Sequence, residues 1–327
     1  MLLTPGFALP ETPPSSPAAD PAAAGITRLS HRGVLLFSGT DAGSFLQGQL
    51  TSDVAQFSKA QWRLAGYCSP KGRLLASGLI WQTSAGFAWL VSRNVMETLG
   101  KRLRMFVMRA KVTITVADVA VFGVTGAGAI GPLAASPLVE MLLLPSVLGS
   151  SRAFAVVETD AAIADFVASG ARLGAHETSN AFWNWLEVRS GMGFIEAATQ
   201  DRFVPQMVNL EALGGVDFKK GCFPGQEVVA RSQYLGKLKR RTLLAHSANG
   251  LAPAPGSDVI SMVTQSPVGT VVSAALAPDG SLDCLVEAPL AAWQDGLALP
   301  DHPNAALEQL APPYALPDNE VFVRPRF

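Results

Sequence analysis

Cys222 and the residues around it are the part of this chain most suited to chemistry. Lys219 and Lys220 precede it, and Pro224 suits the first position of a helix. The N–H groups of a helix N-terminus and nearby ammonium groups both favour negative charge, so the pattern predicts a reactive thiolate. Glycines on both sides would let the backbone turn sharply and a ligand approach closely. The alternative is a buried, inert thiol in a tight turn.

The helix expected after Cys222 adds an amide, a carboxylate and a guanidinium group. Gln226, Glu227 and Arg231 lie on it, and Gly236 is placed to end it. An amide and a carboxylate can pair with the edge of a flat heterocycle, and a guanidinium can bind a carboxylate. Two alternatives stay open: Glu227 and Arg231 form only an intrahelical ion pair, or Gln226 and Glu227 shape the loop.

Residues 205–231 carry a resemblance to a known family. Residues 220–227 match the pattern K-G-C-aromatic-x-G-Q-E without a gap. Eight positions with a cysteine and two glycines are far more specific than a short glycine motif. The segment closely resembles the signature of the YgfZ family of folate-binding proteins, relatives of the aminomethyltransferase (T-protein) of the glycine cleavage system. The resemblance covers about residues 26–290, with counterparts at 32–42, 45–54, 67–73, 109–112 and 185–193.

The resemblance implies an α+β, aminomethyltransferase-like fold in three parts, with a central channel and a C-terminal small β-barrel. It also implies tetrahydrofolate or a derivative as cofactor, bound near Trp185 and Asn209, with Cys222 at the mouth of the channel. The function implied is that of an accessory protein supporting iron–sulfur cluster assembly or maintenance, and thereby methylthiolation of tRNA. Its partners would be iron–sulfur proteins or tRNA-modifying enzymes. The folate-contacting residues expected are Trp185, Asn209, Lys220, Gly221, Gln226, Glu227 and Arg231.

The chain departs from the family pattern in two places. A second family tryptophan, near the first strand, is replaced by Arg32 or Gly33. Residues 74–77 hold no carboxylate where the aminomethyltransferases carry paired aspartates, which argues against the glycine-cleavage reaction. A folate-dependent one-carbon transferase with another acceptor stays an alternative function. Trp185, like Trp183, has the alternative of being a core residue, and Cys68 would face the channel or the core.

Composition sets the remaining limits. A net charge of −1 argues against a protein that coats nucleic acid. Three widely spaced cysteines fit free thiols in a reducing compartment and lack the spacing of a metal motif. We see no charged leader or uninterrupted apolar segment, and we expect a cytoplasmic protein with no membrane span.

Two further motifs suggest other ligands. The basic stretch Lys237, Lys239, Arg240 and Arg241 would let the protein act as a tRNA-binding module, although such charges more often form a solvated hairpin and direct nucleic-acid binding is not expected. Residues 126–131 satisfy G-x-G-x-x-G after a strand-like segment, as in dinucleotide sites, but Pro132 follows directly.

The pattern divides the chain into three regions. We expect a Pro- and Ala-rich flexible tail at 1–25, the folate-binding region at 26–240, and the β-barrel module with an irregular, proline-rich end from about Pro300 at 241–327. Strands are predicted at 34–38, 74–81, 86–92, 112–116, 119–124, 153–158, 243–246, 259–263, 268–275 and 282–286, and helices at 41–49, 94–106, 161–170 and 180–189.

Overall fold

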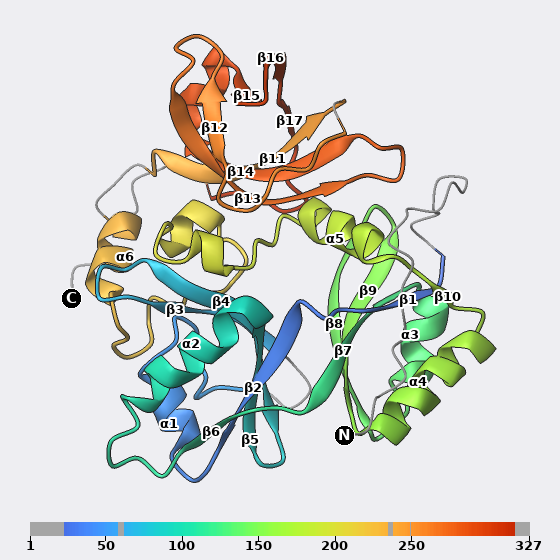
Figure 1. Ribbon diagram of the computed structural model, residues 1–327. Helices are drawn as coiled ribbons and strands as arrows, with labels where there is room; N and C mark the ends of the chain where they lie inside the picture. Colours follow the sequence, from blue (N-terminus) through green and yellow to red (C-terminus); the bar gives the residue numbers. More distant parts are fainter. Residues whose placement is uncertain (1–22, 58–61, 235–237, 249, 318–327) are drawn as a thin grey trace, which may run out of the picture.

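Three β-sheets with flanking helices build the protein in the computed structural model, which describes residues 23–57, 62–234, 238–248 and 250–317. The sheet formed by the C-terminal strands lies above the other two, which stand next to each other (Figure 1). No helix of the described part is both long and apolar enough to cross a membrane.

The first sheet is antiparallel throughout and has the strand order β3-β4-β5-β2-β6. Helix α2 packs on it because Val95, Leu99 and Leu103, spaced four apart, bury one face of the helix. Arg104, at the end of α2, donates to the carbonyl of Ile114 in the edge strand β6, so this edge is partly covered. The elements are β2 (Arg32–Ser38), α1 (Ala42–Gln47), β3 (Trp62–Cys68), β4 (Leu74–Thr83), β5 (Gly86–Ser92), α2 (Arg93–Arg104) and β6 (Thr113–Val116).

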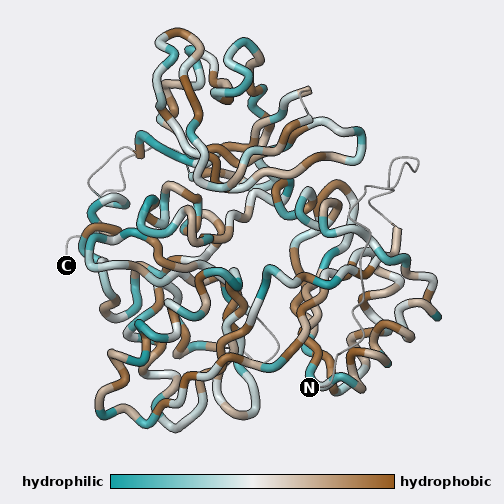
Figure 2. Tube along the Cα trace, viewed as in Figure 1, coloured by the Kyte–Doolittle hydropathy of each residue, from teal (hydrophilic) through white to brown (hydrophobic). Residues whose placement is uncertain are grey.

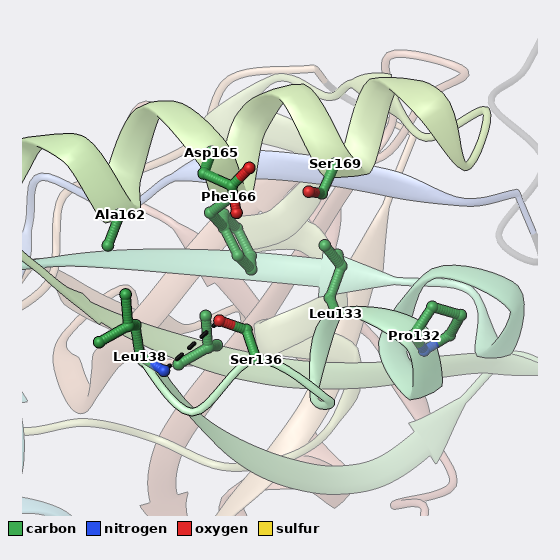
Figure 3. Close-up of a pocket in the computed structure, with 9 residues that line it drawn as sticks. Pro132, Leu133, Ser136, Leu138, Ala162, Asp165, Phe166 and Ser169 are labelled. Carbon is green, nitrogen blue, oxygen red and sulfur yellow. Dashed lines mark hydrogen bonds between the residues drawn. The ribbon is translucent and has the colours of Figure 1, made fainter.

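The second sheet has the order β10-β1-β7-β9-β8, and only its β1–β10 pair is parallel. The G-x-G-x-x-G segment joins β7 to α3, but β7 has antiparallel neighbours, whereas dinucleotide motifs belong to parallel βαβ units. A hollow of about 50 Å³ between α3 and α4 is lined by Leu133 and Phe166 among others (Figure 3). The elements are β1 (Gly25–Arg28), β7 (Val119–Thr125), α3 (Ala127–Leu133), β8 (Val139–Val147), β9 (Ser150–Glu158), α4 (Asp160–Arg172) and β10 (His176–Glu177).

The third sheet has seven strands in the order β16-β15-β12-β13-β14-β11-β17 and curls into a half-barrel (Figure 1). The expectation of an irregular end after Pro300 was wrong, because β16 and β17 complete both edges of this sheet. The short strands carry too few alternating residues to be seen in the sequence. The elements are β11 (Arg240–Ser247), β12 (Asp258–Ser261), β13 (Pro267–Leu276), β14 (Leu282–Pro289), β15 (Leu297–Leu299), β16 (His302–Ala306) and β17 (Glu308–Leu310), with the 3₁₀ turn η3 (Leu290–Asp295).

Helix α5 (Asn180–Arg189) and the segment after it join the three sheets. Phe154 of β9, Trp185 of α5 and Leu285 of β14 belong to one hydrophobic core. Hydrophobic residues concentrate along the strands of all three sheets (Figure 2). The joining segment contains the 3₁₀ turns η1 (Ala197–Thr199) and η2 (Pro205–Val208) and ends in helix α6 (Gln226–Tyr234).

The predicted strands and long helices are found close to their expected bounds, and α5 matches them. The α+β class is confirmed. Strands β3 and β8 were missed, since neither segment alternates cleanly between buried and exposed residues. The proposed tail and barrel boundaries stay predictions; β1 begins at Gly25 and β11 at Arg240.

Candidate functional site

Cys222 lies on an exposed loop ahead of α6, and the other two cysteines are buried. Burial raises the pKa of the Cys68 thiol to about 12, and burial, followed by the charge of Asp283, does the same for Cys284. Both are therefore protonated core residues. Cys222 is the one cysteine that a partner, a cluster or an oxidant can reach.

Helix α6 begins at Gln226, two residues later than Pro224 led us to expect. Gly225 has a φ of +77°, a left-handed conformation that a helix cannot contain. The N–H of Val229 donates to the Gly225 carbonyl in the first turn of α6. Three residues therefore separate Cys222 from the start of the helix, so the partial charge of the helix N-terminus acts on the thiol more weakly than predicted.

The Cys222 loop packs against the turn at residues 69–72. A Cβ atom on Gly225 would lie 2.5 Å from the Ser69 carbonyl oxygen and 2.6 Å from the Cα of Gly72. Gly72 has a φ of +72°, and a Cβ atom on it would lie 2.8 Å from the Cβ of Val228 in α6. The two glycines let two backbones touch, so segments 150 residues apart fix the position of the loop.

Lys220 anchors the loop from the other side. Its ammonium donates to the carbonyls of Gln47 and Leu50, just past the end of α1, and lies 5.3 Å from the ring centroid of Phe223. Burial lowers the pKa of Lys220 to about 8, and the nearby carboxylates of Asp53 and Asp217 oppose this shift. The two hydrogen bonds of the ammonium hold the chain in place. The next residue, Gly221, is exposed, and a Cβ atom on it would meet no other atom within 4 Å.

The polar side chains of α6 face outward or lie half-buried. Glu227 and Arg231 are exposed and Gln226 is half-buried. No ion pair joins Glu227 to Arg231 in the described structure, so the alternative of an intrahelical pair is not realised. Their charged groups are open to a ligand or a partner.

Trp185 lies in the core beneath the C-terminal sheet. Its indole N–H donates to the carboxylate of Asp283 over 2.7 Å, and its ring lies 5.8 Å from that of Phe182. Asp283 also accepts from Arg189 at 3.4 Å and contacts His246 at 2.9 Å. The tryptophan thus ties α5 to β14, as its core alternative required, and folate contact by Trp185 stays a prediction.

Asn209 is also buried, with a left-handed φ of +57°. Its amide donates to the Thr242 carbonyl at 2.7 Å and to the Tyr314 hydroxyl at 3.1 Å, and its oxygen accepts from Arg241 at 3.0 Å. The Tyr314 hydroxyl donates in turn to the carbonyl of Gly191. Every polar atom of the Asn209 side chain is therefore used inside the protein.

Two of the four residues of the basic stretch are bound to carboxylates, which leaves fewer cations for the tRNA-binding alternative. Arg241 is 3% exposed and pairs with the buried Glu211 at 2.8 Å. Arg240 makes two contacts of 2.6 and 2.8 Å with the carboxylate of Glu287. The buried guanidinium of Arg241 is therefore out of reach of phosphates, and that of Arg240 is held by Glu287 although its side chain is 35% exposed. Lys239 is exposed, and Lys237 lies outside the described residues.

Arg32 of β2 and Glu187 of α5 form a buried charged pair that the sequence did not predict. Arg32 donates to Glu187 of α5 at 2.8 Å and its guanidinium lies 4.0 Å from the ring centroid of Phe194. Burial raises the pKa of Glu187, but Arg32 and His31 outweigh it and lower the pKa to about 2. The signal in the sequence was a glutamate within the otherwise apolar core face of α5. Three buried polar atoms have no hydrogen-bond partner in the described structure: the Nε of Arg32, the second carboxylate oxygen of Glu187 and the Nε of Arg152.

The structure divides the predicted site residues into two groups. Lys220, Gly221, Cys222, Gln226, Glu227 and Arg231 lie on the loop and α6, whereas Trp185 and Asn209 lie in the buried junction under the C-terminal sheet. Gln206 connects the two groups by donating to the Val229 carbonyl of α6 at 2.7 Å. Residues 74–77 open β4 without a carboxylate, as the sequence indicated. Within the described part, no three His, Cys, Asp or Glu residues cluster as a metal site would require.

The fold resembles a solved aminomethyltransferase. The glycine cleavage system aminomethyltransferase T from Bartonella henselae superposes with a TM-score of 0.64 at 15% identity, covering 83% of this chain and 79% of that one. At this identity the likeness establishes the fold alone.

Curated relatives are closer in sequence. The tRNA-modifying protein YgfZ of Escherichia fergusonii is 34% identical over 259 residues, covering 75% of this chain and 79% of the relative. The proteins of the same name from Klebsiella pneumoniae and Cronobacter sakazakii are 32% and 33% identical over 287 residues. No protein-family model matches the chain. With this identity over most of both chains and the T-protein fold, the protein belongs to the YgfZ family of tRNA-modifying proteins.

Proposed function

We propose that the protein is a cytoplasmic accessory factor that supports iron–sulfur cluster assembly or maintenance, and thereby the methylthiolation of tRNA, through the thiol of Cys222. One observation carries the proposal: Cys222 is exposed on a loop fixed by two glycines and a half-buried lysine, while Cys68 and Cys284 are buried. A fixed and open thiol suits contact with a large partner better than chemistry on a small substrate in a closed pocket.

A thiolate is a soft ligand of the kind that iron–sulfur clusters prefer. Cys222 offers one such ligand, the other two cysteines are buried, and no three His, Cys, Asp or Glu residues of the described part gather as metal ligands. A cluster handled here would take its remaining ligands from a partner protein. This arrangement favours a factor that assists another protein over one that holds a cluster itself.

A reduced folate, tetrahydrofolate or a derivative, is the cofactor we propose for this site, and it would supply a carrier of one-carbon units. Glu227 and Arg231 are open to it on α6. The buried pair of Arg32 and Glu187 is a separate place that also has unpartnered polar atoms. Trp185 would contribute at most an edge, because its ring is packed and its N–H is used.

The thiol is tested by replacing it. The full chain is expressed in a bacterial strain that lacks its own relative, and methylthiolated adenosine is measured in tRNA digests by mass spectrometry. Cys222→Ala should lose the rescue of methylthiolation, and Cys284→Ala, which removes a buried thiol, should keep it. Equal rescue by both variants would refute the role of Cys222.

The folate is tested separately by titrating purified protein with tetrahydrofolate and following tryptophan fluorescence. We expect saturable quenching that weakens in an Arg231→Met variant, while Lys239→Met behaves like the parent. The absence of saturable quenching would remove folate from the proposal and leave the thiol test unaffected.

A further inference from the structure

The turn that follows α2 exposes an unusual set of side chains. Met105, Phe106 and Met108 are 67%, 44% and 88% exposed, within four consecutive positions. Single exposed apolar residues are ordinary, but three at one tip are not. The apolar face of α2 is already buried through Val95, Leu99 and Leu103, so these three residues are additional to the core.

The same turn is strongly basic. Arg104, Arg109 and Lys111 are exposed, Arg102 is half-buried, and residues 101–111 contain no acidic residue. Lys101 is paired with Glu97 at 2.6 Å, but no carboxylate of the described structure forms an ion pair with the other four cations. In a chain whose net charge is −1, this concentration of positive charge is local.

The turn is held rigidly rather than left loose. Its backbone is closed by bonds from Phe106 to the Leu103 carbonyl at 3.0 Å and from Ala110 to the Val107 carbonyl at 2.8 Å. Met108 has a φ of +44°, a left-handed conformation that non-glycine residues rarely adopt. Such strained positions persist where the surroundings fix them and gather at functional sites.

A tie to α1 places the turn on the side of the molecule that carries Cys222. The N–H of Lys111 donates to the Asp41 carboxylate at 2.7 Å, immediately before α1 begins. Lys220 binds the carbonyls of Gln47 and Leu50 at the other end of α1. A helix of six residues is about 9 Å long, so the turn and the Cys222 loop are anchored a short distance apart.

We propose that residues 104–111 form a docking surface for a protein partner that presents an apolar recess edged by carboxylates. Methionine, phenylalanine and arginine are the residues that protein interfaces enrich, and methionine adapts its shape to a partner. Binding of RNA phosphates would use the cations and leave three apolar side chains in water. A membrane-surface helix would need an exposed apolar face, and that of α2 is buried. A rigid turn also loses little conformational entropy when it binds.

The test places a photo-crosslinking amino acid in the full-length protein. A benzoylphenylalanine replaces Met108 in one variant and, as the matched control, Val263, which is 71% exposed on the C-terminal module. After irradiation in cells, adducts are separated and the crosslinked peptides are identified by mass spectrometry. The Arg109→Glu, Lys111→Glu double change is then added to the Met108 variant, and thermal unfolding confirms that the fold is kept.

We expect a protein adduct at position 108 that is absent at position 263, with a crosslinked peptide that contains acidic and apolar residues. The double charge reversal should reduce this adduct at least tenfold while the melting temperature stays within about 2 °C, because both side chains are exposed. An adduct sensitive to ribonuclease, an adduct with lipid, equal labelling at both positions, or no adduct at position 108 would each overturn the proposal. So would a protein adduct that the charge reversal leaves unchanged.

Discussion

The Cys222 loop and the buried junction beneath the C-terminal sheet are built in opposite ways. In the loop, glycine backbones touch and a lysine binds carbonyl groups, so the functional side chains remain outside. In the junction, the indole N–H of Trp185 donates to Asp283, the amide of Asn209 donates to the Thr242 carbonyl, and Arg241 donates to Asn209. The loop therefore presents chemistry, and the junction holds three sheets in one arrangement. Substitutions in the two regions should separate activity from stability.

The largest loss of stability is expected at the junction, for Arg241→Met. The change leaves the buried Glu211 carboxylate without its partner, and breaking a buried pair in this way costs about 3–5 kcal/mol. Chemical denaturation measures it. Lys239→Met, in the same basic stretch but exposed, should stay within about 0.5 kcal/mol. Similar values for the two would mean that Arg241 is not part of the junction.

The central pair of Arg32 and Glu187 should make stability depend on acid pH. The pKa of Glu187 is lowered from 4.5 to about 2, so its contribution is present above pH 5. It is lost as the pH falls toward 2, by about 3 kcal/mol. Denaturation of the parent and of Glu187→Gln should give a difference in unfolding free energy that shrinks across this range. A constant difference would contradict the assignment of the charge to Glu187.

The glycine contact of the loop is tested by two alanine substitutions at similar backbone angles. Gly225 has a φ of +77° and Gly214 one of +75°, but only the Cβ on Gly225 would meet other atoms. Gly214→Ala should cost about 1 kcal/mol from conformation alone. Gly225→Ala should cost about 2 kcal/mol more and impair tRNA methylthiolation, because the loop must move away from Ser69. Equal costs would show that the two turns are not in close contact.

The smallest effect on stability is expected for Cys222→Ala, below about 0.5 kcal/mol, because the side chain is exposed. Alkylation with iodoacetamide should label one cysteine of the native parent and none in this variant. All three thiols of the parent should react after unfolding, since Cys68 and Cys284 are protected only by burial. Labelling of the native variant would place a second thiol within reach of solvent.

The sequence by itself determined the α+β class, most strands and helices, the family, and the importance of the segment around Cys222. These follow from local information: apolar periodicity, turn residues and an uninterrupted motif. The tertiary structure alone decided which side chains of that motif are available. Lys220 is used by α1, Arg240 and Arg241 by buried carboxylates, and Asn209 by residues more than 30 positions away. Burial and ion pairing depend on what the fold brings together across long sequence separations, and no local pattern encodes that.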